Sequence, residues 1–267
     1  MLHPTKMKRC LKLRKIEKSD IIGEEFCTNR CGKCVVIDYQ GYYNVTVMFS
    51  EPLYITRCDL SSLRSGGIFN PLIPTFYGKG YFGIGKYSSK DKKFMQLWQS
   101  VLERCYSEKY KSLFPTYKDV TVCEEWLNFQ NFAAWCESQE FYKMKEKNGR
   151  NYHLDKDILI KGNKVYSPET CCFVPSEINS LTAKANSVRG KNPLGVYYYQ
   201  KTDRFIARLR RYGKSYYVGS YRTPEEAFVA YKQAKESYIK EVAEKWRWKI
   251  DEKVYQTLMS WEVSIDD

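Results

Sequence analysis

Histidine is scarce in this chain of 267 residues, which contains only two. The chain also has no apolar run approaching the ~18 residues that a membrane-spanning helix requires. Its first twenty residues are basic and lack the apolar segment of a secretory signal. These absences predict a protein that neither spans a membrane nor is secreted.

Cysteine is plentiful, with ten residues, but they are scattered through the chain. Without a signal peptide, this distribution favours reduced thiols in a cytosol over a disulfide framework. Cys27, Cys31, Cys34 and Cys58 are close enough in sequence to suggest structural zinc. Their spacing is irregular, and Cys34 belongs to a strand pattern, so packed free thiols are expected instead of structural zinc.

The formal net charge is +13 at pH 7. A compact protein with this much self-repulsion usually has a polyanionic partner. Nucleic acid is the first candidate and an anionic membrane surface is the second. The lack of long apolar runs makes the membrane partner the weaker of the two.

The order of strand and helix patterns predicts a multidomain α+β protein. A helical pattern (92–140) is expected to bury its aromatic stripes, with Trp98 and Trp126 among them. The expected parts are a basic arm (1–20), a small β module (21–88), a helical and ββα domain (89–190), a domain of three strands and one helix (191–246), and a C-terminal helical tail (247–267).

Short β-branched and aromatic runs begin at Cys34, Tyr43 and Tyr54, with glycines between them. They predict a small barrel or a curled sheet. The glycine-rich segment 78–86 fits neither the P-loop spacing nor the dinucleotide-binding spacing. It is interpreted as a linker in which glycine allows tight turns.

An acidic cluster follows, in which a strand is expected from His153 to Ile160. Because side chains alternate across a strand, His153, Asp155 and Asp157 would share one face. A second strand is expected from Thr170 to Val174, and then a helix with Ser176 as its N-cap.

The cluster could bind a hard divalent cation, Mg²⁺ or Mn²⁺, with Asn179 as a further ligand. The alternative is an exposed strand whose aspartates form ion pairs with Lys156 and Lys161.

Three strands are expected at 195–199, 204–210 and 214–219, followed by a helix that starts at Thr223-Pro-Glu-Glu. Period-two alternation places arginines of the second strand on one open face, framed by tyrosines. Arginine suits phosphate and the guanine edge, whereas the alternative is a solvated face. The predicted nucleic-acid-binding residues are Tyr197, Tyr199, Arg204, Arg208, Arg210, Arg211, Lys214, Ser215 and Tyr217.

The segment 192–240 resembles the DNA-binding domain of APETALA-type ethylene-response factors, which also occurs in phage and mobile-element proteins. The resemblance rests on Gly195-Val, Phe205-Ile-Ala-Arg-Leu-Arg, Val218-Gly-Ser-Tyr and Thr223-Pro-Glu-Glu-Ala-Phe-Val-Ala-Tyr. It implies that the sheet enters the major groove of double-stranded DNA. Several contact positions differ from the family's arginines and tryptophans, so no base preference is implied.

The segment 90–185 resembles phage-type HNH endonucleases. The resemblance rests on Trp98…Arg104-Cys-Tyr, on Val122-Cys-Glu-Glu-Trp, on Leu154-Asp-Lys-Asp, and on Tyr166-Ser-Pro-Glu-Thr-Cys followed by Asn179. It implies a metal held by Asp155 or Asp157 with Asn179, and His153 as the base that activates water. Many family members have histidine where this chain has Asp155, and a subtype has asparagine where it has Thr170.

Together these features predict a phage-encoded, Mg²⁺-dependent DNA endonuclease acting in the cytoplasm of a bacterial host. Two alternatives remain open at this stage. One is a binding protein with the same fold that does not cut, and the other is recognition of RNA through the tyrosine-rich face. The oligomeric state cannot be deduced from the sequence.

Overall fold

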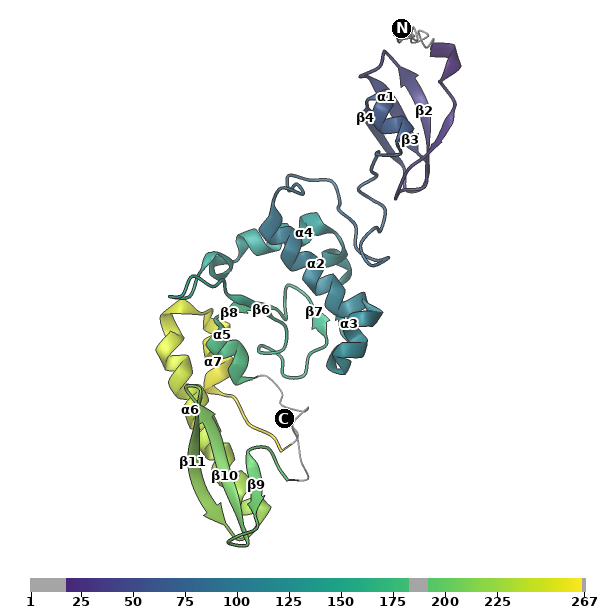
Figure 1. Cartoon of the computed structure of the whole chain (residues 1–267). Coiled ribbons are helices and arrows are strands. Elements are labelled where there is room, and N and C mark those ends of the chain that lie inside the picture. Colours follow the sequence, from purple (N-terminus) through teal and green to yellow (C-terminus); the bar gives the residue numbers. More distant parts are fainter. Residues whose placement is uncertain (1–17, 183–191, 266–267) are drawn as a thin grey trace, which may run out of the picture. The chain divides into compact units, whose positions relative to one another are not determined.

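The computed structural model describes residues 18–182 and 192–265 (Figure 1). The chain divides between Lys86 and Tyr87 into two compact units, which are described separately. Most of the expected basic arm lies outside the described residues; its last part forms the short 3-10 helix η1 (Lys18–Asp20).

The N-terminal unit is built on one antiparallel sheet with the strand order β1-β2-β3-β4. The helix α1 follows the sheet and is capped by Asp59, whose carboxylate accepts the backbone N–H of Ser62 at 2.8 Å. The elements are β1 (Glu25–Cys27), β2 (Lys33–Tyr39), β3 (Val45–Phe49), β4 (Tyr54–Cys58) and α1 (Leu60–Arg64).

Alternation along β3 shows how this sheet forms a core. Val45, Val47 and Phe49 are buried, whereas Thr46 and Met48 between them are half-buried. The buried face packs on Leu60 and Leu63 of α1, among other residues of one hydrophobic cluster. The sheet is therefore one-sided, with β1 and β4 as its edges in the described pairing, and a closed barrel is not confirmed.

The second unit begins with a helical layer around buried tryptophans. Trp98 and Trp126 are fully buried, and the indole N–H of Trp98 donates to the carbonyl of Trp126 at 2.7 Å. The aromatic stripes therefore form core, as expected. The elements are α2 (Lys92–Tyr106), α3 (Glu108–Leu113), η2 (Pro115–Tyr117), β5 (Thr121–Val122), η3 (Glu124–Leu127), α4 (Phe129–Ser138) and η4 (Glu140–Lys143).

A small ββα arrangement follows, in which β6 (His153–Asp155) pairs antiparallel with β8 (Cys172–Val174) and α5 (Ser176–Leu181) follows β8. Between the two strands the chain forms β7 (Val165–Tyr166), which pairs parallel with β5. The order strand, turn, strand, helix agrees with the expectation, although the connection is longer and contains β7.

Two local predictions in this region are wrong. The first strand ends at Asp155 instead of Ile160, because the Asp155 carboxylate accepts the backbone N–H groups of Asp157 and Ile158 and turns the chain away from β8. Ser176 is the first helical residue and the N-cap position is Pro175; the backbone N–H of Ser176 donates to Glu146 instead.

The C-terminal sheet has the order β11-β10-β9 and is antiparallel throughout. Its strands are β9 (Val196–Tyr199), β10 (Arg204–Arg211) and β11 (Lys214–Tyr221), which confirms the predicted sheet to within two residues. The helix α6 (Pro224–Trp246) packs against it (Figure 1). It starts as predicted, with the Thr223 hydroxyl accepting the backbone N–H of Glu226 at 3.2 Å.

One hydrophobic cluster runs through the whole C-terminal half of the second unit. It contains Ile158 and Val174 from the ββα arrangement, Leu209 from the sheet, and Tyr231 and Val242 from α6. The boundaries expected at residues 190 and 246 therefore do not divide the core. The ββα arrangement, the sheet and the C-terminal helices are built around the same buried side chains.

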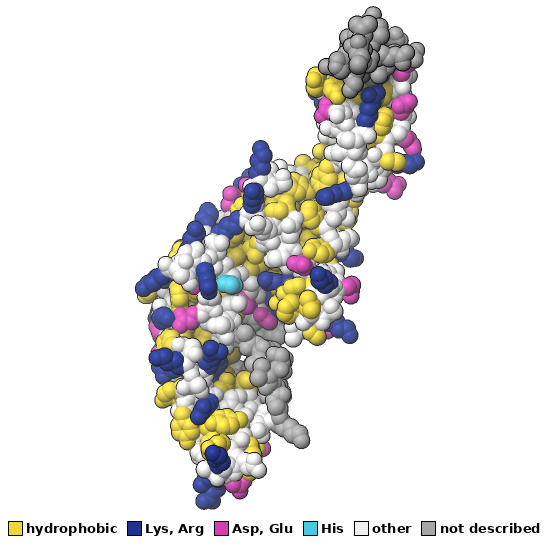
Figure 2. Space-filling model, in the orientation of Figure 1, with side chains coloured by type: hydrophobic (Ala, Val, Ile, Leu, Met, Phe, Trp, Pro, Cys, Tyr) yellow, Lys and Arg dark blue, Asp and Glu magenta, His cyan; other side chains and the backbone are white. Residues whose placement is uncertain are grey.

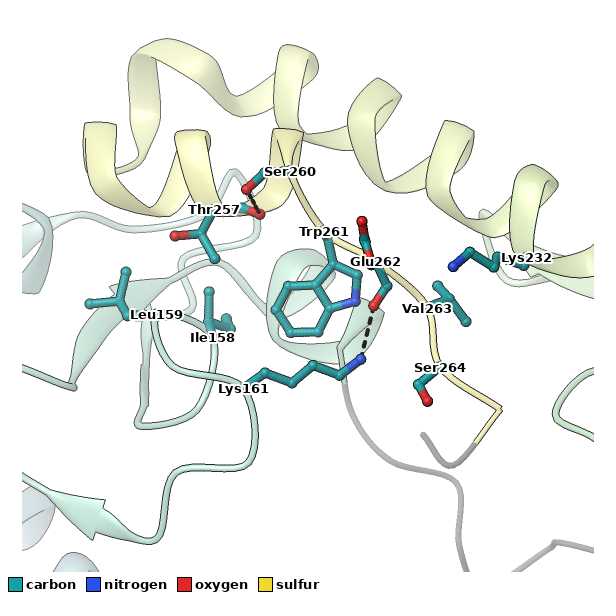
Figure 3. A pocket seen from close by; sticks show the side chains of 10 residues that line it. All are labelled: Ile158, Leu159, Lys161, Lys232, Thr257, Ser260, Trp261, Glu262, Val263 and Ser264. Carbon is teal, nitrogen blue, oxygen red and sulfur yellow. Dashed lines mark hydrogen bonds between the residues drawn. The ribbon is translucent and has the colours of Figure 1, made fainter.

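The chain ends with η6 (Arg247–Lys249), α7 (Glu252–Met259) and an extended segment. This segment lies against the ββα arrangement, because the Lys161 ammonium donates to the Glu262 carbonyl at 2.8 Å and lies 5.4 Å from the centre of the Trp261 ring (Figure 3). A helical tail is thus present, but it covers only part of the range 247–267. None of the described helices is both long and apolar enough to cross a membrane.

Gly195 provides a test of the packing between sheet and helix. Its φ is +75°, and a Cβ added there would lie 2.1 Å from the Tyr231 ring. We expect Gly195→Ala to lower the free energy of unfolding of the second unit by about 2–4 kcal/mol, from backbone strain and overpacking together. Urea unfolding followed by tryptophan fluorescence would report on this unit, because all six tryptophans lie in it.

Gly213→Ala is the matched control, since Gly213 also has a positive φ of +78° but has no atom within 4 Å of an added Cβ. It should cost only about 1 kcal/mol. Equal losses for the two variants would show that the Tyr231 contact does not determine the packing.

Candidate functional site

The predicted catalytic residues His153 and Asp155 lie on the same side of β6. Leu154 between them is buried, His153 is exposed and Asp155 is half-buried. Asp157 lies beyond the end of the strand, so the face shared by three residues that the sequence predicted contains only two. The turn nevertheless brings Asp157 back to Asp155.

The turn after β6 is held by a set of short hydrogen bonds. The Asp155 Oδ1 atom accepts the backbone N–H of Asp157 at 2.8 Å and that of Ile158 at 2.9 Å. The Lys156 ammonium donates to Asp157 Oδ2 at 3.0 Å and to the carbonyl of Asn163 at 3.0 Å. The Asn163 amide donates in return to the Lys156 carbonyl at 2.7 Å, which closes the turn.

The backbone N–H of Asp157 donates to the Asp155 carboxylate, and the surroundings of this turn change the acidity of Asp155. Burial raises the pKa of Asp155 to about 6, and the neighbouring charge of Asp157 acts in the same direction. The two backbone N–H groups oppose this shift. Two carboxylates this close repel each other unless a proton or a cation lies between them.

Glu146 is a neighbour of His153 that the sequence reasoning missed. Its Oε1 atom accepts the backbone N–H of Ser176 at 2.7 Å. Partial burial works against its charged form, but the bond from Ser176 and the closeness of His153 lower the pKa of Glu146. Glu146 precedes the motif region and belongs to no motif, so only the fold shows that it lies near His153.

Asn179, the third predicted metal ligand, lies in α5 and is half-buried. Its backbone N–H donates to the Pro175 carbonyl at 3.0 Å within the helix. Among the described residues, its side-chain amide makes no hydrogen bond. The helix that presents it follows directly on β8, which pairs with the strand of Asp155.

The donor set of the turn suits Mg²⁺ or Mn²⁺, which prefer carboxylate and amide oxygens. Within the described ranges 18–182 and 192–265, no three His, Cys, Asp or Glu side chains form a metal-binding group. Mg²⁺ sites on nucleic-acid enzymes commonly use one or two carboxylates and complete their shell with water and substrate phosphates. The Asp155–Asp157 pair meets that requirement.

Two of the four N-terminal cysteines make hydrogen bonds to the backbone. The Cys31 Sγ atom accepts the backbone N–H of Asn70 at 3.3 Å, and Cys58 Sγ donates to the Val45 carbonyl at 3.6 Å. Burial raises the pKa of the Cys58 thiol to about 11.

The C-terminal sheet has an open face opposite α6. Cross-strand partners share a face, and the register pairs Arg204 with Tyr199, Arg208 with Tyr217, and Arg210 with Ser215. Ile206, which pairs with Tyr197, is on the same face. Seven of the nine predicted nucleic-acid-binding residues lie on this surface, which we call the arginine face: Tyr197, Tyr199, Arg204, Arg208, Arg210, Ser215 and Tyr217.

The remaining two predicted residues, Arg211 and Lys214, pair with each other on the opposite face. The Arg211 guanidinium forms an ion pair with Glu241 of α6, which also accepts the Tyr212 hydroxyl at 2.8 Å. Alternation along β10 explains the change of side, since Arg211 follows Arg210 by one residue. Arg211 holds the sheet on its helix, and neither residue extends the arginine face.

The arginines of the arginine face are not neutralised by carboxylates of their own strands, since β9, β10 and β11 contain no Asp or Glu. The Arg208 guanidinium lies 5.4 Å from the centre of the Tyr197 ring, an arrangement that orients the charge without pairing it. Lys and Arg side chains lie among hydrophobic ones over the C-terminal sheet and helix in the view of Figure 2. The face is suited to a polyanion.

A pocket of about 470 Å³ lies elsewhere in the second unit, between the 158–161 loop and the C-terminal segment (Figure 3). Lys161, Lys232 and Glu262 give it charges of both signs, and Trp261 forms part of its wall. It includes neither the carboxylate pair nor the arginine face. We assign it no role.

Comparison with protein-family models, with curated proteins and with solved structures found no match for this chain.

The raised pKa of Asp155 predicts a pH-dependent stability. A carboxyl group that is more basic in the folded state favours folding below its unfolded pKa and loses this contribution as the pH rises through about 6. Asp155→Asn keeps an oxygen for the two backbone bonds and removes the charge. Without metal, we expect it to gain about 1–2 kcal/mol over the wild type at pH 7.5 and little at pH 4.

Urea unfolding in the presence of a chelator at both pH values measures this difference. Asp119→Asn, a change on the exposed surface, corrects for the loss of one negative charge. A difference that does not grow with pH would contradict the assignment of a strained carboxyl pair.

Proposed function

We propose that this protein is a DNA-binding, divalent-metal-dependent endonuclease of the HNH type. The observation that supports it most strongly is the Asp155–Asp157 pair at the end of β6, where the charge of Asp157 acts on the half-buried carboxyl group of Asp155 and the same strand carries the exposed His153. A like-charged pair is costly to maintain for the fold alone. A site of this kind is typical of cation binding at phosphodiester chemistry.

In this proposal Asp155 and Asp157 would hold one Mg²⁺ or Mn²⁺, with Asn179 as a further oxygen ligand. When bound, the metal stabilises the charge that develops on the phosphate and the leaving oxygen. His153 would accept the proton from the attacking water. The Lys156 ammonium keeps Asp157 at the turn through its 3.0 Å bond.

The arginine face would hold the duplex. Arg204, Arg208 and Arg210 point to the side that α6 does not cover, and a sheet of this size can enter the major groove. The shared hydrophobic core keeps this face in a constant position relative to the carboxylate pair. Binding and cutting would therefore occur at a set distance along the DNA.

A second candidate is a DNA-binding protein with the same fold that does not cut. The turn itself favours it, because Asp155 already accepts two backbone N–H groups and Asp157 is paired with Lys156.

Recognition of RNA is a third candidate, supported by the exposed rings of Tyr199 and Tyr217, on which unpaired bases could stack. Competition between duplex DNA and single-stranded RNA for the protein distinguishes DNA binding from RNA recognition.

The resemblance of the two sequence segments to phage HNH endonucleases and to APETALA-type domains fits this proposal. In that setting the protein would be phage-borne and would act on DNA in the cytoplasm of the bacterial host.

Plasmid cleavage with Mg²⁺ or Mn²⁺ tests the enzyme directly. We expect the wild type to nick or linearise DNA and the double variant Asp155→Asn, Asp157→Asn to lose at least 100-fold in rate, on the order of the contribution of a metal-held charge. Its affinity for DNA in the absence of metal should stay within about threefold of the wild type, since neither residue lies on the arginine face.

Asp119→Asn serves as the matched control and should cleave like the wild type. Salt-sensitive DNA binding without cleavage by any of the proteins, on DNA that contains its binding site, would support the second candidate instead.

Two arginines of the same strand test the DNA-binding surface. We expect Arg208→Gln to weaken binding to duplex DNA by about 1–3 kcal/mol and to reduce the slope of log K against log salt by about one. Arg211→Gln removes the same charge from the other side of β10, where the arginine is paired with Glu241, and should have a smaller effect. Fluorescence anisotropy at salt concentrations from about 50 to about 300 mM would measure the DNA affinity and the salt slope of each variant.

Equal losses for the two variants would indicate general attraction to a basic protein and would contradict a specific arginine face.

A further inference from the structure

Arg104, near the end of α2, is a half-buried cation outside the sites described so far. Its Nη1 atom donates to the Tyr166 hydroxyl at 3.2 Å. Among the described residues it forms no ion pair with a carboxylate. Its charge is therefore held in a partly desolvated place where no described carboxylate compensates it.

The groups around Arg104 are phenols. Tyr166 is its hydrogen-bond partner, and Tyr117 and Tyr110 also lie close enough to act on its charge. The rings of Tyr110 and Tyr117 meet edge to face at 5.4 Å. Burial raises the pKa of Tyr166, so this phenol stays neutral and orients the guanidinium without neutralising it.

No described carboxylate offsets the desolvation of this guanidinium, but the phenols around it act against that cost and raise the pKa of Arg104. The planar fork of arginine matches the oxygens of a phosphate, and only part of the fork is used by Tyr166. The unused part of the fork suits an anion of this geometry.

Arg104 is hydrogen-bonded to the chain segment that follows the carboxylate pair. Its partner Tyr166 belongs to β7, within the connection that joins the strand of Asp155 to β8. The charges of Arg104 and Lys156 both act on the buried thiol of Cys105, and the Lys156 ammonium donates to Asp157. The Lys164 ammonium, next to β7, donates to the Thr116 carbonyl at 3.2 Å and brings a further cation to this side.

We propose that Arg104, oriented by the Tyr166 hydroxyl, binds a phosphodiester group of the DNA backbone beside the Asp155–Asp157 pair. The inference rests on the proposed function and extends it, since it names the residue that places the substrate strand at the metal site. A free phosphate would offer the same oxygens, and the test separates the two sources.

The experiment measures binding of duplex DNA by the full chain, without divalent metal, as a function of salt. We expect Arg104→Gln to lower affinity roughly tenfold and to reduce the log–log salt slope by about 0.9, the value for one phosphate contact. Arg104→Lys keeps the charge and should retain the slope while losing part of the affinity. Lys253→Gln, on the exposed side of α7, controls for the loss of one charge.

Thermal unfolding distinguishes a binding residue from a structural one. Because the charge is unpaired, Arg104→Gln should unfold at the same temperature as the wild type or above it. A lower unfolding temperature together with unchanged DNA binding would overturn the proposal, and so would DNA binding equal to that of Lys253→Gln.

A further experiment with inorganic phosphate tests whether Arg104 binds free phosphate instead of the DNA backbone. If millimolar phosphate raises the unfolding temperature of the wild type but not of Arg104→Gln, while DNA affinity is the same for both, the site binds free phosphate and the assignment to the DNA backbone is wrong. The inference can fail by itself, with cleavage still dependent on Asp155 and Asp157. Conversely, the wild type could fail to cleave DNA while Arg104→Gln still weakens DNA binding. That result would contradict the proposed nuclease activity and support the phosphate contact of Arg104.

Discussion

The structure of the second unit depends on the packing of helix α6 over its whole length. Its first half covers the three-stranded sheet, where Tyr231 closes on Gly195. Its last turn reaches α5, where Glu177 accepts the Lys245 ammonium at 2.7 Å and the Trp246 indole N–H at 2.7 Å. A helix of 23 residues thus joins the arginine face and the ββα arrangement through one core, so neither site can move without disturbing buried side chains.

Within this frame the turn after β6 combines local stability with local strain. The backbone N–H groups of Asp157 and Ile158 end the strand on Asp155, which defines the turn well. The same bonds bring a second carboxylate near the first, and the pKa of Asp155 is raised mainly by its burial and further by the charge of Asp157. Strain of this kind is common where a protein is arranged around a ligand, because the bound cation relieves it.

Positive charge is used in two distinct ways in this unit. Arg211 and Lys245 are paired with carboxylates of neighbouring elements and hold helices and strands together. Arg208 and Arg104 instead contact aromatic rings or phenols, which orient a guanidinium and leave its charge available. The net charge of +13 does not reveal this difference, since it counts both kinds alike.

Sequence patterns alone determined much of the C-terminal sheet and its helix. Alternation along 204–211 and the Thr223-Pro-Glu-Glu start are local signals, and the structure has both where they were expected. The same alternation places Arg204, Arg208 and Arg210 on the open face, because it depends only on strand geometry.

Tertiary structure decided the rest. The end of β6 at Asp155 depends on a side chain competing with the sheet for backbone N–H groups, and no periodicity shows the outcome of that competition. The nearness of Glu146 to His153 and of Arg104 to Tyr166 joins residues 7 and 62 positions apart, which only the packed chain brings together. The continuous core across residues 190 and 246 has the same origin, since burial depends on which apolar faces meet after folding.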